Sequence, residues 1–478
     1  MNSIQTIAKN TAFLFLADVF GKLCWFVLSV LVARYIGVLA FGHYSFAMDF
    51  TFLFATFAIF GFNSYITREL AAHPEKAATY IGNILSLKLM LAIATGVVLA
   101  LSVLFLPHPT EVKHIVFLIG IAGILNTFTL YFRSIFVAYE KMGYDALLNM
   151  SEKGLFLVFG LFALFGEWGL WGLAVAYFSA ITVSLFLSYV ICARFFVFPK
   201  PQYDYMLWKM IFVAALPFIG TSFFGMVYLK LHTTMLSFLQ DNTAVGLYNA
   251  GYQIVDGLRL IPIIFIYAIF PAMSRFAAQS KERLLFTTER AAKYIAMGAF
   301  PIAIGGILLA EKLLVALYGS AFLSGARTFQ LLLLALSFIY ITRPLYLGIM
   351  AVDKHVLNFY LAIAAISATI ILNVFLIPSY GIEGAAITLL FVEIMLFVCS
   401  YWFFRKYIAS IPWIRLLGKP FLAAVLMGGV VFMLREQSIV LTIPVGFVVY
   451  LVFLLLIHVF DGEDKKIILQ LLTRREKQ

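Results

Sequence analysis

The stretch VGLYNAGYQIVDGLRLIP, residues 245–262, is hydrophobic enough to cross a membrane, yet it carries two charges and a helix breaker. Asp256 and Arg259 are three residues apart, so their side chains share one face of a helix. A charge at the centre of a bilayer costs about 3 kcal/mol on insertion scales, and such residues usually face a partner or a wet pathway. Pro262 has no backbone N–H, which predicts a bend. The stretch predicts either a charged, bendable wall of a polar cavity or a self-neutralising structural pair.

Other hydrophobic stretches also contain ionisable residues. Asp18 and Lys22 are four residues apart and share a helix face, which again allows pairing. The further candidates are Asp49, Lys88, Arg133, Lys230, His232, Arg343 and Glu393. Lys88, Arg133 and Arg343 lie near predicted span ends, from which their long side chains could reach the lipid headgroups. The stretches hold six cations and four carboxylates, which favours an anionic substrate, because arginine binds phosphate oxygens in a forked geometry.

The composition places these charges in a polytopic membrane protein. Of 478 residues, 63% are hydrophobic and 12% are charged, whereas soluble proteins carry roughly 25% charged residues. The net charge is +11, but no basic block alternates with aromatic residues, so we expect no nucleic-acid partner. Cys24, Cys192 and Cys399 show neither a disulfide framework nor metal-ligand spacing. We therefore expect no metal site and no cofactor.

The loops predict the orientation of the chain. A helix needs about 20 apolar residues to cross the hydrocarbon core, and this length predicts about fourteen spans. If the N-terminus is cytoplasmic, the cytoplasmic segments contain 23 Lys and Arg residues and the outer segments contain 5. Basic residues concentrate in cytoplasmic loops. The pattern predicts a multi-pass protein of the cell membrane with both termini in the cytoplasm.

The chain also repeats itself at an interval of about 204–213 residues. Gly42-His-Tyr44-Ser45 corresponds to Gly246-Leu-Tyr248-Asn249 at the start of the second and eighth predicted spans. A repeat of six spans predicts an all-α fold of two parallel six-helix bundles, an arrangement in which transporters bind substrate between the bundles. The predicted parts are an N-terminal bundle (1–194), a cytoplasmic linker (195–208), a C-terminal bundle (209–404), two extra helices (405–460) and a charged cytoplasmic tail (461–478).

Four segments carry a family resemblance. They are LVARYIGVLAFGHYSFAMDF (31–50), TTMLSFLQDNTAVGLYNAGYQIVD (233–256), IFPAMSRF (269–276) with a charged cytoplasmic loop expected after it, and IPSYGIEGAAIT (377–388). They resemble span junctions of the polysaccharide transporters and O-antigen flippases of the multidrug/oligosaccharidyl-lipid/polysaccharide superfamily. The resemblance covers roughly residues 1–405, and the last two spans fit the fourteen-helix form of the family. One departure is His232, where many relatives carry Asp.

The resemblance implies a two-lobed transporter, not an enzyme, with a cationic central cavity. It would move a polyprenyl-pyrophosphate-linked oligosaccharide from the cytoplasmic to the outer leaflet, working as a monomer alongside polysaccharide-assembly proteins. The cations expected to bind the pyrophosphate are Lys22, Lys230, Arg259 and Arg343. The carboxylates expected to pair with those cations, or to exchange coupling ions, are Asp18, Asp49, Asp256 and Glu393.

Three other functions stay open at this point. A flippase for the peptidoglycan lipid precursor would share the fold and the excess of cations. A cation-coupled multidrug exporter would favour the opposite charge balance. A membrane glycosyltransferase or polysaccharide polymerase usually exposes acidic residues in large outer loops, whereas the outer loops predicted here, such as GEWG and QDNT, are short.

Overall fold

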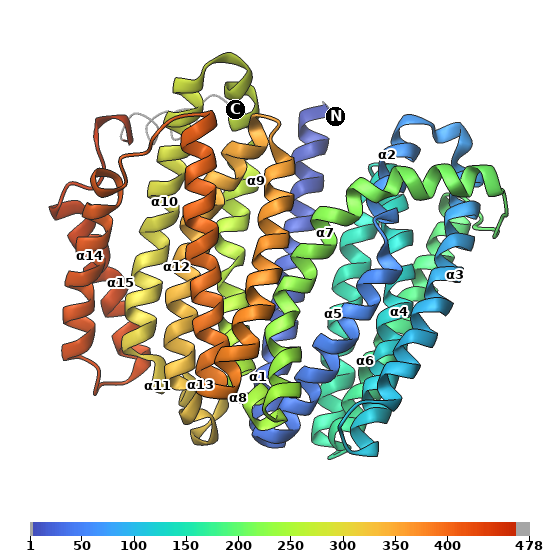
Figure 1. Ribbon diagram of the computed structural model, residues 1–478, viewed down its shortest axis with the longest axis horizontal. Coiled ribbons are helices and arrows are strands. Elements are labelled where there is room, and N and C mark those ends of the chain that lie inside the picture. The colour runs from blue at the N-terminus through green and yellow to red at the C-terminus, as the bar shows by residue number, and fades with distance from the viewer. Residues whose placement is uncertain (1–2, 465–478) are drawn as a thin grey trace. The chain divides into compact units, whose positions relative to one another are not determined.

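The computed structural model describes residues 3–464, apart from the side chains of residues 3–12, 215–223, 226, 263–264, 266–268 and 355. Within this part the chain is helical and contains no strand, which confirms the predicted all-α fold (Figure 1). The helices are α1 (Ser3–Ile59), α2 (Phe62–Ala72), α3 (Ala77–Leu104), α4 (Thr110–Ala138), α5 (Met142–Phe165), α6 (Gly169–Phe195), α7 (Tyr205–Leu239), α8 (Asn242–Leu258), α9 (Leu260–Gln279), α10 (Lys281–Leu308), α11 (Ala310–Tyr318), α12 (Ala326–Ala351), α13 (His355–Tyr407), α14 (Trp413–Met433) and α15 (Ile439–Leu456), with short 3-10 helices η1 (Pro74–Lys76) and η2 (Ser320–Gly325).

The chain divides into two compact units. Unit 1 comprises Met1–Ala250 and Ala362–Ala385, and unit 2 comprises Gly251–Leu361 and Ala386–Gln478. Unit 1 therefore contains α1 to α7, most of α8 and the middle of α13. Unit 2 contains the rest of α8, α9 to α12, α14, α15 and the rest of α13. The predicted bundle boundaries, 1–194 and 209–404, stay a prediction.

Ten segments of the described residues are long and apolar enough to span a membrane. Two of them are far longer than one crossing needs: Phe13–Ala72 has 60 residues and Val356–Tyr407 has 52. Each contains a glycine with positive φ, Gly37 (φ 79°) in α1 and Gly381 (φ 56°) in α13, a conformation that glycine adopts without strain. Figure 1 shows α1 reversing direction along its length. The number of crossings, fourteen, stays a prediction.

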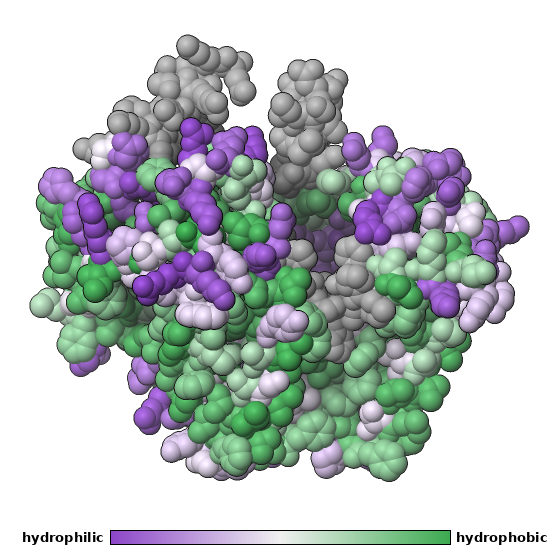
Figure 2. Space-filling model, turned by 45° about the horizontal axis from the view of Figure 1, so that its top comes forward, coloured by the Kyte–Doolittle hydropathy of each residue, from purple (hydrophilic) through white to green (hydrophobic). Residues whose placement is uncertain are grey.

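Large hydrophobic side chains cover the outside of the helices. Ile414 is 92% exposed, Val440 is 84% exposed and Met433 is 82% exposed. Figure 2 shows hydrophobic residues over the lower part of the surface, while hydrophilic residues gather toward the top of that view. Exposed apolar surface of this extent requires lipid rather than water around it. Together with the apolar spans, it confirms a multi-pass membrane protein.

The glycines of the repeated motifs meet in unit 1, where α1 crosses α8. A Cβ atom on Gly42 would lie 1.6 Å from the carbonyl oxygen of Asn242. A Cβ atom on Gly246 would lie 2.2 Å from the carbonyl oxygen of Val38. Small residues allow membrane helices to approach until their backbones touch. The two equivalent positions of the repeat therefore form one backbone-to-backbone contact.

The connection between α6 and α7 is pinned to α3. The backbone N–H of Gln202 donates to the carbonyl of Gly82 (3.1 Å), and the N–H of Asp204 donates to Asn83 Oδ1 (2.9 Å). A side chain at Gly82 would lie 2.4 Å from the carbonyl oxygen of Lys200, so the close approach requires glycine. The Asp204 carboxylate also caps the first turn of α7. The end of this segment next to α7 is thus held against α3.

The prediction of a charged loop after residues 269–276 is wrong. Helix α9 continues to Gln279, and α10 begins at Lys281, so that only Ser280 lies between them. Ser280 is extended (φ −162°, ψ 131°), and its side chain accepts a hydrogen bond from the N–H of Arg283, as an N-cap does. The residues KERLLFTTER begin with good helix formers, so their charges mark a solvated helix end.

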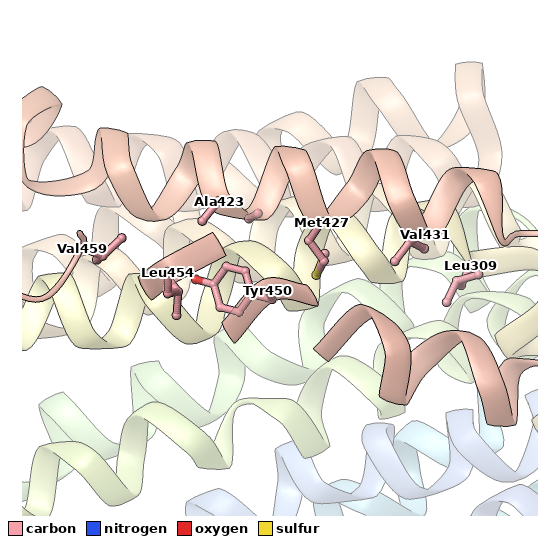
Figure 3. Close-up of a cluster of buried hydrophobic side chains, with 8 residues drawn as sticks. Leu309, Ala423, Met427, Val431, Tyr450, Leu454 and Val459 are labelled. Atoms are coloured by element: carbon pink, nitrogen blue, oxygen red, sulfur yellow. The ribbon is translucent and has the colours of Figure 1, made fainter. Parts of the chain in front are cut away.

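The last two helices pack against α10 in unit 2. Ala423, Met427 and Val431, spaced four residues apart on α14, point into a buried cluster with Tyr450 and Leu454 of α15 (Figure 3). The Tyr450 hydroxyl donates to the backbone carbonyl of Met297 in α10 (2.8 Å). Burial of this apolar face and the hydroxyl contact together attach α14 and α15 to the rest of the unit.

The segment after α15 is tied to α10 by charge. The Asp464 carboxylate is fully buried and accepts hydrogen bonds from Arg290 Nη1 (2.7 Å), Lys293 Nζ (2.5 Å) and the Tyr294 hydroxyl (2.6 Å). Arg290 Nη1 also donates to Asp461 Oδ2 (2.6 Å). Burial opposes the charge, but the hydrogen bonds from Lys293, Tyr294 and the Asp461 amide hold the pKa of Asp464 below its usual value.

Asp464→Asn should release this segment from α10. The substitution leaves two cations without a buried carboxylate, and breaking such a pair costs roughly 3–5 kcal/mol. Because the folded pKa is depressed, the wild-type contribution is complete above the unfolded pKa of about 4 and is lost as the pH falls through the folded value. Amide hydrogen exchange of residues 457–464 between pH 7 and pH 3 measures both effects. Asp461→Asn, at a carboxylate that is 49% exposed, should have a smaller effect. Equal protection in Asp464→Asn and wild type would contradict the assignment.

Candidate functional site

Arg259 lies at a joint between two helices of unit 2. Helix α8 ends at Leu258 and α9 begins at Leu260, which confirms the break predicted from Pro262. Because proline has no N–H, it cannot donate to the carbonyl of Leu258, four residues earlier. The Tyr340 hydroxyl of α12 donates to that carbonyl instead, at 2.6 Å. A neighbouring helix thus satisfies the backbone group that the proline leaves free.

The Arg259 side chain is buried beside this joint, with 7% exposure. Its Nη1 donates to the Tyr252 hydroxyl (3.0 Å), and its guanidinium lies over the Tyr252 ring. Nη2 lies 3.8 Å from Glu393 Oε1 on α13, and Glu393 is 5% exposed. The structure therefore brings together two of the predicted site residues, Arg259 and Glu393, from different helices.

Two other predicted site residues of unit 2 are half-buried. Asp256 lies on α8, three residues before Arg259. Arg343 lies on α12, directly before Pro344. The pairing of Asp256 with Arg259 and the phosphate-binding role of Arg343 stay predictions.

Unit 1 contains a separate ion pair between α1 and α7. Lys230 Nζ lies 2.6 Å from Asp49 Oδ1, and the two side chains are 28% and 10% exposed. The ammonium also lies 5.7 Å from the centroid of the Phe52 ring. Asp49 is one of the carboxylates expected to pair with a candidate cation, and in the structure its partner is Lys230.

A second polar network in unit 1 connects α1, α4 and α5. Asn149 Nδ2 donates to Asp18 Oδ1 (3.1 Å), and Asn149 Oδ1 lies 3.5 Å from Arg133 Nη1. Arg133 also forms an ion pair with Asp145. The expectation that Arg133 reaches the headgroups is wrong, because its side chain is 14% exposed and is paired. Lys22, on the same helix as Asp18, is half-buried, and its role stays a prediction.

Lys88 does not reach out of the protein toward the headgroups either. It is fully buried in α3, and its Nζ donates to the carbonyl of Ala58 (3.1 Å) between the rings of Phe128 and Tyr131. Ala58 is in the last turn of α1, where the carbonyls have no partner within the helix. A cation at this negative end of the helix dipole is stabilising. Lys88 therefore closes the C-terminus of α1.

Sequence reasoning missed one polar face on α5. Asp145, Asn149 and Glu152 are all buried and are spaced four and three residues apart, so they lie on one side of the helix. Lys153 lies in the same helix, with its Nζ 2.5 Å from Glu152 Oε1. The spacing of these polar residues was a signal available in the sequence.

His232, the departure from the family pattern, is buried in unit 1 with 2% exposure. Its Nδ1 lies 3.3 Å from Asn373 Nδ2, and its ring lies nearly parallel to that of Tyr248. Within the described residues, no group of three or more His, Cys, Asp and Glu side chains could hold a metal ion. The surroundings of His232 are those of a hydrogen-bonded core histidine.

The exposed apolar helices and the charges buried inside each unit define a polytopic helical membrane protein. Residues 7–277 match the family described as "Polysaccharide biosynthesis protein". This match covers more than half of the chain, and the chain belongs to that family. The predicted resemblance is thereby confirmed.

Relatives and solved structures agree with this assignment. The chain is 22% identical over 415 residues to the capsular polysaccharide biosynthesis protein CapF of Staphylococcus aureus, covering 84% of this chain and 100% of CapF. It is 27% identical over 212 residues to the probable flippase AglR of Haloferax volcanii, covering 43% of this chain and 44% of AglR. The chain thus spans less than half the length of AglR.

The fold is similar to that of the lipid II flippase MurJ in an inward closed conformation. The TM-score is 0.77 at 16% identity, and the match covers 92% of this chain and 97% of MurJ. At this identity the likeness concerns the fold. It agrees with the predicted all-α membrane fold.

Proposed function

We propose that this protein is a flippase that moves a polyprenyl-pyrophosphate-linked oligosaccharide from the cytoplasmic to the outer leaflet of the cell membrane by alternating access. Membership of the polysaccharide biosynthesis family and the similarity to two flippases support a lipid-linked substrate. The excess of cations within the hydrophobic spans supports an anionic one. The pyrophosphate supplies that charge, while the polyprenyl chain stays in the bilayer.

The observation that carries the proposal is the buried guanidinium of Arg259. Charge-assisted hydrogen bonds between nitrogen and oxygen are about 2.7–2.9 Å long, whereas the contact between Arg259 and Glu393 is 3.8 Å. A phosphate oxygen can therefore compete with Glu393 for the guanidinium. The arginine also lies at the joint between α8 and α9, where binding can be coupled to a change in the helix angle.

Lys230 offers a second positive charge, held in place by Asp49 until the substrate arrives. The cations that we propose to neutralise the pyrophosphate are Lys22, Lys230, Arg259 and Arg343. The carboxylates that we propose to hold these cations, or to exchange protons during the cycle, are Asp18, Asp49, Asp256 and Glu393. We propose no catalytic residue and no cofactor.

Reconstitution in liposomes tests the substrate. Purified protein is incorporated into liposomes that contain a polyprenyl-pyrophosphate oligosaccharide, and a glycosidase added outside reports how fast the glycan from the inner leaflet becomes accessible. We expect rapid accessibility compared with protein-free liposomes, because unaided headgroups do not cross the hydrocarbon core. Because flipping involves no sugar transfer, we expect the full-length protein to accelerate glycan accessibility without any sugar donor in the assay.

Parallel liposomes distinguish the alternatives. Acceleration with the peptidoglycan lipid precursor, but not with the polyprenyl-pyrophosphate oligosaccharide, would replace the proposal with the precursor flippase. Transfer of a labelled sugar from a donor would reassign the protein to the glycosyltransferases. Export of cationic dyes without glycan flipping would favour the multidrug exporter. Absence of acceleration with and without a proton gradient would contradict the proposal.

A further inference from the structure

A polar cavity of about 400 Å³ lies in unit 2, away from the charges proposed to bind the substrate. Its walls come from residues 289–293 of α10, the start of α14 and the segment after α15. The charged side chains that line it are Glu289, Arg290, Lys293, Arg415, Lys419 and Asp461. None of them belongs to the proposed pyrophosphate site.

The charges of this cavity do not balance. Arg290 and Lys293 are engaged by Asp461 and by the buried Asp464. Arg415 and Lys419 are exposed and four residues apart, so they lie on one face of α14. Lys419 Nζ donates to the backbone carbonyl of His458 (3.1 Å), which leaves its charge uncompensated by any carboxylate there.

Glu289 is the remaining carboxylate on the cavity wall, and it lies close enough to both Arg290 and Arg415 to interact with them. Glu289 is thus a single carboxylate for two cations, Arg415 and Lys419, which do not pair with Asp461 or Asp464. Arg415 and Lys419 lie on one helix face beside this cavity. The guanidinium can donate two parallel hydrogen bonds to a phosphate group, and the ammonium adds a compact positive charge.

Exposed apolar side chains neighbour the lining residues in the sequence, and we take them as an apolar rim that faces lipid. Ile414 precedes Arg415 and is 92% exposed, and Phe421, two residues after Lys419, is 50% exposed. Leu456, at the end of α15, is 64% exposed. A ligand with an anionic head and hydrocarbon chains could place its head in the cavity and its chains along α14.

We propose that this cavity binds the phosphate headgroup of an anionic phospholipid of the bilayer, with Arg415 and Lys419 as its main contacts. Basic pockets between helices at the cytoplasmic membrane face bind anionic headgroups. The distribution of Lys and Arg predicts that this end of the unit is cytoplasmic. The bound lipid joins α10, α14 and the C-terminal segment, and it does so independently of the transported substrate.

Native mass spectrometry of the full-length protein in detergent tests this site. Phosphatidylglycerol is titrated as the probe, with phosphatidylcholine as the zwitterionic control of equal chain length. We expect saturable binding of phosphatidylglycerol and much weaker binding of phosphatidylcholine. Equal binding of the two lipids would overturn the proposal. Inorganic phosphate at millimolar concentration should not displace the lipid, because it gains nothing from the apolar rim; displacement would overturn the assignment to a lipid.

A double variant with a matched control locates the binding. Arg415→Gln with Lys419→Gln should weaken phosphatidylglycerol binding about thirtyfold, since each basic residue near an anionic surface contributes about fivefold. Arg405→Gln with Lys406→Gln removes the same charge from exposed positions at the end of α13, outside the cavity, and should leave the affinity unchanged. Equal losses in both variants would show unspecific attraction and overturn the site, as would unchanged binding in the first. Thermal unfolding of both variants checks that they are folded.

Discussion

Arg259→Ala is expected to abolish flipping while the protein still folds. The guanidinium is buried beside the joint of α8 and α9 and is held by the Tyr252 hydroxyl and a long contact to Glu393. Hydrogen bonds to charged groups contribute roughly 1.5–3 kcal/mol, so losing a forked contact to pyrophosphate should slow flipping by about a hundredfold or more, to a rate close to that of protein-free liposomes. The liposome assay with external glycosidase measures this rate directly.

Two further variants separate a role in substrate binding from a role in folding. Arg259→Lys keeps the charge but loses the forked geometry, so flipping should be intermediate. Arg259→Ala combined with Glu393→Gln removes both charges and avoids leaving Glu393 buried without its partner. This double variant should fold and remain unable to flip. Wild-type flipping by either alanine variant would remove Arg259 from the mechanism.

The second large effect is expected at the crossing of α1 and α8. Gly42→Ala places a methyl group 1.6 Å from a backbone oxygen of Asn242, so the helices must move apart along their whole contact. Overpacking usually costs about 1–3 kcal/mol, and backbone atoms cannot turn aside as a side chain can, so a cost at or above the upper end is expected. Gly42→Leu should prevent folding.

Helix α8 offers the matched control. A Cβ atom on Gly257 meets nothing within 4 Å, so Gly257→Ala should keep or raise stability through its better helix propensity. Thermal unfolding in detergent and the yield of monodisperse protein measure the comparison. If Gly42→Ala unfolds at the wild-type temperature, the backbones do not touch as described. Gly246→Ala, whose methyl group would meet Val38, should resemble Gly42→Ala.

Local backbone chemistry was predictable from the sequence, and partners across helices were not. Pro262 predicts a bend in the helix because the missing N–H is a property of the proline itself. The interruption lies at Arg259, three residues before that proline. Nothing near Pro262 in the sequence indicates that Tyr340 would supply the lost hydrogen bond. That contact depends on which helices pack together, and periodicity does not specify this.

For the charged residues, too, the sequence indicated local features but not the partners on other helices. Their presence within hydrophobic stretches was plain, and spacing suggested pairs within one helix, Asp18 with Lys22 and Asp256 with Arg259. The structure adds ion pairs that join different helices, between Asp49 and Lys230 and between Arg133 and Asp145, and spacing along the chain does not predict such partners. Hydrophobic length also does not reveal the polar residues that are buried near the end of a helix, such as Asp145, which the structure places against Arg133.

The hydrogen bond from Tyr340 to the Leu258 carbonyl also constrains how unit 2 can move. A carbonyl released by proline in a soluble protein can turn to water, but in hydrocarbon it must keep a protein donor. Sliding α12 past α8 by even one turn would carry the hydroxyl about 5 Å from its acceptor and leave that carbonyl unsatisfied. Shear between these two helices is therefore disfavoured, whereas rotation of both as one block preserves the bond. The hydrogen bond of Tyr340 therefore favours movement of α8 and α12 as one rigid body.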